Sequence, residues 1–304
     1  MSEGPGYHQL HRRGPHGLGR QLLGIVLVLV GMFILSGVVS LVAYAAEAVL
    51  QGGPGRSVDP FDDPGPVLMG GILLGLAATI PLVLLVSWGL HGLRPGFVVS
   101  VAGRIRWRYL GGCLGLSVVA MFATLLVGSL VPSGTREQLS STAHPVDGRV
   151  VALLVTVALL TPLQAAGEEF VFRGYLTQAF GAVFPTAVAV LLPAVLFALA
   201  HGSQSAPVFV DRLAFGIVAG LLVVLTGGLE AGIAMHMVNN WLAFGVAILT
   251  GDLGDSLQPT GGTWWTLPGT LTQSLVYLGL AVWLARRQGL ATRSATAPTW
   301  GDAP

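Results

Sequence analysis

The chain has 304 residues, of which 53% are hydrophobic and only 10% are charged. A soluble domain carries about 25% charged residues, so most of this chain is expected to contact lipid. Its net charge of +1 argues against a nucleic-acid partner, and its single cysteine excludes an internal disulfide and a cysteine-rich metal site.

Eight apolar stretches approach or exceed the length of about 20 residues that a helix needs to cross a bilayer. They run approximately over residues 22–48, 67–90, 109–131, 150–178, 186–203, 212–227, 230–250 and 268–285. We therefore predict an all-α membrane protein, a bundle of about eight transmembrane helices. One polytopic domain is expected over residues 21–288, between disordered tails at 1–20 and 289–304 that are rich in Gly, Pro, Ala or Thr.

The arginines predict how the chain is oriented. They gather in the N-terminal tail, after the second stretch and in the C-terminal tail: Arg12, Arg13, Arg20, Arg94, Arg104, Arg106, Arg108, Arg286, Arg287 and Arg293. Two of the opposite loops are acidic, with Asp59, Asp62, Asp63, Asp252 and Asp255. Since basic loops stay in the cytoplasm, we expect a multi-pass protein of the cell membrane with both termini cytoplasmic.

Five titratable side chains lie inside apolar stretches, where lipid disfavours them: Glu168, Glu169, Arg173, His201 and His236. A charge at bilayer depth costs about 2.5 kcal/mol or more, so such residues usually mark a functional site. Their depths along the helices are compatible with one intramembrane polar cavity, in which they would solvate one another.

The acidic pair belongs to the sequence G-E-E-F-V-F-R-G at 167–174. Glu169 and Arg173 are four residues apart and can form an ion pair on one helix face. Glu168 is turned about 100° away and has no partner in its own segment, which suits a general base. The alternative is a charged cluster at a helix end that reaches the interface.

The histidines belong to two further clusters. His201 ends an apolar helix one turn after Phe197, where a packing or interfacial role is the alternative to function. His236 and Asn240 share one helix stripe, and Asn239 is expected to face elsewhere or towards a neighbouring helix. An asparagine in a membrane helix can also serve in hydrogen bonding between helices.

Three further charged residues lie at predicted span boundaries: Asp211, Arg212 and Glu230. We interpret them as interfacial charges. The patterns H-E-x-x-H and G-x-S-x-G and a phosphate-binding loop are absent from the sequence, which weighs against zincin, serine-hydrolase and ATPase functions.

Together, E-E-x-x-x-R, F-x-x-x-H and H-x-x-x-N, in this order on separate predicted helices, resemble the CPBP family. This family comprises CAAX proteases and bacteriocin-processing enzymes and is also called the Abi family. The resemblance covers about residues 150–250 and implies intramembrane proteolysis facing the cytoplasm. Eukaryotic members cleave prenylated C-terminal CAAX tails, whereas bacterial members have varied roles, so no prenylated substrate is assigned here.

The resemblance suggests a hydrolysis without a covalent acyl-enzyme, since the clusters contain no serine or cysteine nucleophile. Glu168, with His201, would position and deprotonate a water. His236 and Asn240 would donate hydrogen bonds to the developing oxyanion.

Glu169 and Arg173 would support this geometry, or Arg173 would bind a substrate carboxylate. Because the family is often labelled metalloprotease, the alternative is a Zn²⁺ site with Glu168, His201 and His236 as ligands. The expected partners are membrane lipids and a peptide or membrane-protein substrate.

Two functions of other classes use the same residues. A transporter would use the buried ionisable groups as a proton or ion relay, and it predicts inverted repeats, of which the sequence shows none. A non-catalytic immunity-type membrane protein would keep the fold without turnover.

Overall fold

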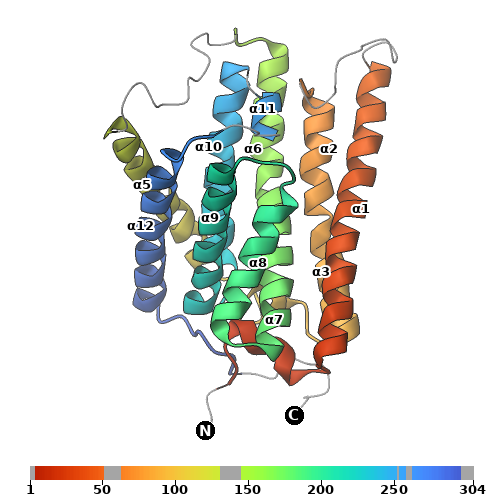
Figure 1. Cartoon of the computed structure of the whole chain (residues 1–304), viewed down its shortest axis with the longest axis vertical. Helices are drawn as coiled ribbons and strands as arrows, with labels where there is room; N and C mark the ends of the chain where they lie inside the picture. The colour runs from red at the N-terminus through yellow and green to blue at the C-terminus, as the bar shows by residue number, and fades with distance from the viewer. Residues whose placement is uncertain (1–3, 51–62, 131–144, 252, 258–261, 296–304) are drawn as a thin grey trace.

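The computed structural model describes residues 4–50, 63–130, 145–251, 253–257 and 262–295. These residues form helices and no strand, which confirms the predicted all-α class (Figure 1). In chain order, the elements are η1 (Tyr7–Arg13), α1 (Leu18–Leu50), α2 (Pro66–Ala77), α3 (Thr79–His91), α4 (Gly96–Val99), α5 (Trp107–Leu130), α6 (Gly148–Glu169), η3 (Phe170–Leu176), α7 (Thr177–Val183), α8 (Thr186–Ala200), α9 (Ala206–Thr226), α10 (Glu230–Thr250), α11 (Leu253–Leu257) and α12 (Thr266–Arg287).

Seven helical units of the described chain are long and apolar enough to cross a membrane. They are α1, the continuous α2–α3 unit, α5, the continuous α6–η3–α7 unit, α9, α10 and α12. The fifth predicted stretch forms α8, whose 15 residues extend only about 22 Å against a hydrocarbon core of about 30 Å. The expected count of about eight is therefore close, and the chain is a multi-pass membrane protein.

The short helix α8 packs against α9 as a hairpin. Figure 1 shows that the connection between them stops short of the end reached by α6 and α10. The residues of this connection therefore lie part of the way along the neighbouring helices, and not beyond their ends.

The two termini of the described chain meet at one end of the bundle (Figure 1). The backbones of Gly6 and Arg293 form an isolated antiparallel bridge, and the Ser294 N–H donates to the Pro5 carbonyl at 3.0 Å. The two termini of the described chain therefore lie on the same side of the bundle. Of the acidic loop residues, Asp59, Asp62 and Asp252 lie outside the described residues.

The N-terminal tail differs from the disordered segment expected for residues 1–20. Its residues Tyr7–Arg13 form the 3-10 helix η1, which packs on α7. Tyr7 and Leu10 are fully buried, and the Tyr7 hydroxyl donates a hydrogen bond to the Val98 carbonyl. The two apolar side chains, three residues apart, give this short segment a face that the end of the bundle covers.

The acidic motif lies where an α-helix changes into a π-helix. The α-helix α6 ends at Glu169, and the π-helix η3 follows directly from Phe170. The Thr177 hydroxyl donates to the Phe172 carbonyl, five residues earlier, at 3.1 Å. Short π-helical segments occur frequently at functional sites, because the extra residue per turn reorients side chains.

Two glycines allow this motif to pack closely. A Cβ at Gly167 would come within 2.3 Å of the Leu76 carbonyl, so α6 approaches α2 at this point. A Cβ at Gly232 of α10 would come within 2.8 Å of a Glu169 carboxylate oxygen. Because neither glycine has a side chain, α6 can pack closely against both α2 and α10, and the two glutamates lie between these helices.

Candidate active site

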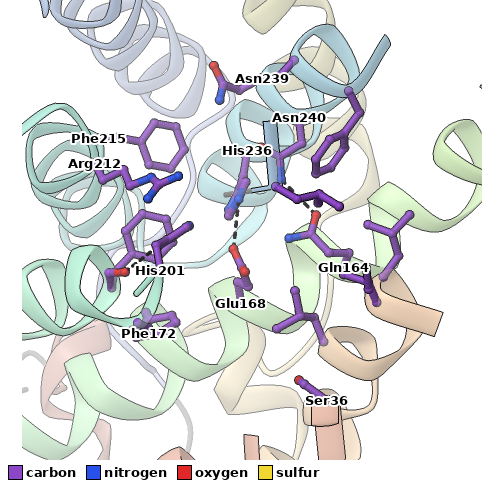
Figure 2. A pocket seen from close by; sticks show the side chains of 18 of the residues that line it. Ser36, Gln164, Glu168, Phe172, His201, Arg212, Phe215, His236, Asn239 and Asn240 are labelled. Carbon is purple, nitrogen blue, oxygen red and sulfur yellow. Dashed lines mark hydrogen bonds and ion pairs between the residues drawn. The ribbon is translucent and has the colours of Figure 1, made fainter. Parts of the chain in front are cut away.

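A cavity of about 460 Å³ lies among α1, α2, α6, α8, α9 and α10. The wall from α1 and α2 is mainly apolar, with Met32, Phe33, Ile72, Leu73 and Leu76. The facing wall is polar, and Figure 2 shows its side chains directed towards one another from different helices. All four residues expected to be catalytic line this one cavity: Glu168, His201, His236 and Asn240.

His236 joins the two glutamates. Its Nε2 lies 3.2 Å from Glu168 Oε2 (Figure 2), and its Nδ1 lies 3.0 Å from Glu169 Oε1. Glu168, which has no partner in its own segment, therefore finds one on α10. The predicted ion pair on one helix face is also present, with Arg173 Nη1 3.1 Å from Glu169 Oε1.

The hydrogen-bonding partners of His236 define its protonation state. Both ring nitrogens face carboxylates, which accept hydrogen bonds and do not donate when ionised. An imidazolium satisfies both, and together with Arg173 it balances the two carboxylates. These four side chains are at most 11% exposed, and charge neutrality explains how they are tolerated at this depth. His236 therefore holds the acidic pair at the cavity wall with both ring nitrogens engaged, and its expected role as an oxyanion donor stays a prediction.

The ring of Phe197, the first residue of the second motif, contacts three polar side chains of the site: Arg173, His201 and His236. The Arg173 guanidinium carbon lies 4.2 Å from the centre of its ring. The rings of His201 and His236 approach it edge-on, at centroid distances of 4.7 and 5.9 Å. Arg173 is thus 1% exposed and covered by an aromatic ring, which excludes it as the binding group for a substrate carboxylate.

His201 follows α8 directly and presents the opposite chemistry to His236. Its Nδ1 lies 2.8 Å from the Phe197 carbonyl oxygen, which can only accept a hydrogen bond. The proton is therefore on Nδ1, and Nε2 has a free lone pair. Because His201 is exposed and lines the cavity, it offers a proton acceptor there.

An amide pair continues the polar wall. Asn240 Nδ2 donates to Gln164 Oε1 at 2.9 Å, which leaves the second amide hydrogen of Asn240 for another acceptor. Gln164 was not predicted, although its position four residues before Glu168 puts it on the same helix face. Asn239 also lines the cavity.

Asp211 and Arg212 also line the cavity and are not interfacial charges as expected. The predicted sixth span began at residue 212, whereas α9 begins at Ala206, so Arg212 lies nearly two turns inside the helix. Ser205 at the N-cap and Pro207 in the first turn are typical helix-start signals, and they would have placed this boundary correctly.

The side chains do not fit the alternative zinc site as they are arranged. Of the three proposed ligands, His236 has both nitrogens engaged by carboxylates, which leaves no lone pair for a metal. Within the described part of the chain, no group of three or more His, Cys, Asp or Glu side chains is placed to hold a metal ion.

Comparison with known proteins identifies the region that holds this site. Residues 149–242 match the family described as type II CAAX prenyl endopeptidase Rce1-like. The chain is also similar to the protein named "Uncharacterized protein YyaK" of Bacillus subtilis (strain 168), with 24% identity over 204 residues. That match covers 62% of this chain and 66% of the relative, just under two thirds of its length. The match over residues 149–242 confirms the resemblance that the three motifs suggested, and this part of the chain is similar to the Rce1-like family.

Proposed function

We propose that this protein is an intramembrane endopeptidase of the CPBP/CAAX-protease type, which hydrolyses a peptide bond with an activated water. The observation that carries the proposal is the placement of Glu168, His201 and Asn240 around one cavity by three different helical segments. A peptidase family match over the same residues supports it.

Glu168 is the proposed general base. His236 holds one of its carboxylate oxygens, which leaves the other for a water in the cavity. Glu168 takes a proton from this water as the water oxygen bonds to the substrate carbonyl carbon. When the C–N bond then breaks, the same carboxyl group returns the proton to the leaving amine.

His201 and Asn240 complete the proposed chemistry. The unprotonated Nε2 of His201 accepts the second hydrogen of the water and so orients its lone pair. The second amide hydrogen of Asn240 is the proposed donor to the carbonyl oxygen as it becomes negative. A donor of this kind contributes about 10²–10³ in rate. Gln164 orients the Asn240 amide through a hydrogen bond. In the same way, Glu169, which is paired with Arg173, orients the His236 ring.

We further propose that the protein resides in the cell membrane with both termini in the cytoplasm. The arginines support this orientation, because both terminal segments, which meet at one end of the bundle, contain several of them. The apolar wall from α1 and α2 favours a membrane-anchored or hydrophobic peptide segment as the substrate.

Cleavage of a membrane-anchored peptide library by the purified protein tests the proposal. We expect turnover by the native protein and a loss of about 10²–10⁴-fold in Glu168→Gln. Asp63→Asn, which alters only an exposed ion pair with Arg149, is the matched control and should leave turnover intact. Equal turnover by Glu168→Gln would refute the assigned base, and turnover that a chelator abolishes would restore the metalloprotease alternative.

A further inference from the structure

The cavity holds a guanidinium that the proposed chemistry does not use. Arg212 lies nearly two turns into α9 and lines the polar wall together with Glu168 and His201. Figure 2 shows its side chain extending from α9 towards the space in front of His236. A cation at this depth in a membrane protein is costly unless it is compensated, so its presence requires an explanation.

None of the ion pairs formed within the part of the chain that the structure describes includes Arg212. The acidic cluster at the site is already neutral, because His236 and Arg173 balance its two carboxylates. The adjacent Asp211 lines the same cavity but forms no ion pair with Arg212. The positive charge of Arg212 is therefore available to the cavity.

A neutral side chain holds Arg212 in place. Gln204, in the connection between α8 and α9, accepts a hydrogen bond from Arg212 Nη1 at 2.7 Å. The amide nitrogen of Gln204 in turn donates to the Ala198 carbonyl at 2.6 Å, which anchors it to the end of α8 beside His201. An amide orients a guanidinium without neutralising it, and most of its five N–H donors remain for a ligand.

We infer that Arg212, oriented by Gln204, binds a carboxylate of the substrate and so determines specificity. The inference rests on the proposed peptidase function. Its physical basis is that a planar guanidinium binds a carboxylate with two parallel hydrogen bonds. On a peptide, this carboxylate is either the chain terminus or an Asp or Glu side chain close to the scissile bond.

The test compares membrane-anchored peptides that share one sequence and differ in charge. One has a free C-terminal carboxylate, the second a C-terminal amide, and the third an Asp-to-Asn or Glu-to-Gln change near the scissile bond. A charge-assisted pair predicts that one neutral peptide has a kcat/KM about 10- to 100-fold lower than the charged parent. The peptide that shows this loss identifies the source of the carboxylate.

Two variants examine the side chains themselves. Arg212→Gln should reduce the ratio of kcat/KM between charged and neutral peptides to about 1. Gln204→Glu retains the guanidinium but puts a carboxylate in hydrogen-bonding contact with it, so the ratio should fall in the same way. Arg287→Gln removes an exposed guanidinium at the end of α12, far from the cavity lining, and should leave the ratio unchanged.

Binding of fluorescent versions of the three peptides to Glu168→Gln protein separates this inference from the proposed function. If no peptide is cleaved by the native protein but the carboxylate still strengthens binding and Arg212→Gln removes that effect, the peptidase assignment fails and the anion site stands. If peptides are cleaved but charged and neutral ones have equal kcat/KM, the inference is overturned. Equal losses for all peptides in Arg212→Gln would overturn it too, because they would indicate a role in the oxyanion or the fold.

Discussion

His201 and His236 have the same side chain but opposite hydrogen-bonding partners. His236 faces two carboxylates, whereas the Nδ1 of His201 faces a backbone carbonyl. The first arrangement stabilises a buried acidic pair, and the second leaves a proton acceptor in the cavity. The two residues should therefore respond differently to the same substitution.

We expect His236→Gln to lower both activity and stability. The substitution leaves Glu168 and Glu169 buried with a single cation, and loss of one partner from a buried charged network costs about 3–5 kcal/mol. His201→Gln should reduce kcat by about 10²–10⁴-fold and change the free energy of unfolding little, because His201 is exposed. Unfolding in detergent and peptide turnover measure the two effects, and equal destabilisation by both variants would contradict the assignment.

The Glu169–Arg173 pair should behave as one unit. Arg173→Met leaves Glu169 buried beside His236 and is expected to cost about 3–5 kcal/mol of folding free energy. Adding Glu169→Gln removes the uncompensated charge, so the double variant should be more stable than the two single losses predict when added. A thermodynamic cycle in detergent measures this coupling, and strictly additive losses would show that the pair is not coupled.

The sequence predicted part of this site because some contacts are local. The Glu169–Arg173 pair follows from spacing along one helix. The partner of Glu168 does not, because His236 lies 68 positions later and only helix packing brings the two together. Arg212 was misplaced for a different reason, since hydropathy detects the apolar length of a helix and not its first polar turn.

At the scale of the elements, the N-terminal 3-10 helix η1 closes one end of the bundle. The His11 ring stacks on the His91 ring of α3 at 4.0 Å, and Tyr175 of η3 contacts both. His11 Nδ1 lies 3.2 Å from Gln21 Oε1 of α1. The tail is therefore connected to the π-helix that follows the acidic motif.

Burial, and then the neighbouring His91, hold the pKa of His11 well below its usual value of 6.5. The detached segment would take up a proton near pH 6.5, while the docked segment would not. Docking should therefore be complete above about pH 6.5 and should weaken as the pH falls, by up to about 1.4 kcal/mol per pH unit. Hydrogen exchange of residues 7–13, corrected for intrinsic rates, should increase between pH 7.5 and 5.5.

His11→Phe is the control for this pH dependence, because it keeps an aromatic ring for stacking and removes the titration. In this variant the corrected exchange of residues 7–13 should not change with pH. An equal increase in His11→Phe would assign the effect to another group, such as His8, whose pKa burial also lowers.

At the scale of the whole molecule, the structure is an apolar bundle with one polar interior wall. Hydropathy alone predicted this class, because the lipid-facing surface of every long span must be apolar; Leu41 and Val42 of α1 are 65% and 64% exposed. Hydropathy overestimated α8, which is apolar along its length but has only 15 residues. The folded N-terminal segment was missed because a seven-residue helix carries too little periodicity to detect.

The arrangement of the termini gives a topological prediction. Both ends of the described chain lie at one end of the bundle, and α1 carries the chain to the other end before α2 begins (Figure 1). Tags at the two termini should therefore react only after permeabilisation of cells, and a tag inserted after Asp63 should react in intact cells. Opposite accessibility of the two termini would contradict the fold, and reversed accessibility of all three tags would contradict the orientation.

The origin of the oxygen in the new carboxylate tests the proposed hydrolysis most directly. Cleavage of a membrane-anchored peptide in H₂¹⁸O, followed by mass spectrometry, should show one ¹⁸O in the N-terminal product and no transfer of the acyl group to added hydroxylamine. The same product should form at least about 100-fold more slowly in Glu168→Gln. Product formation at the native rate in that variant, or acyl transfer to hydroxylamine, would contradict direct attack by a water that Glu168 activates.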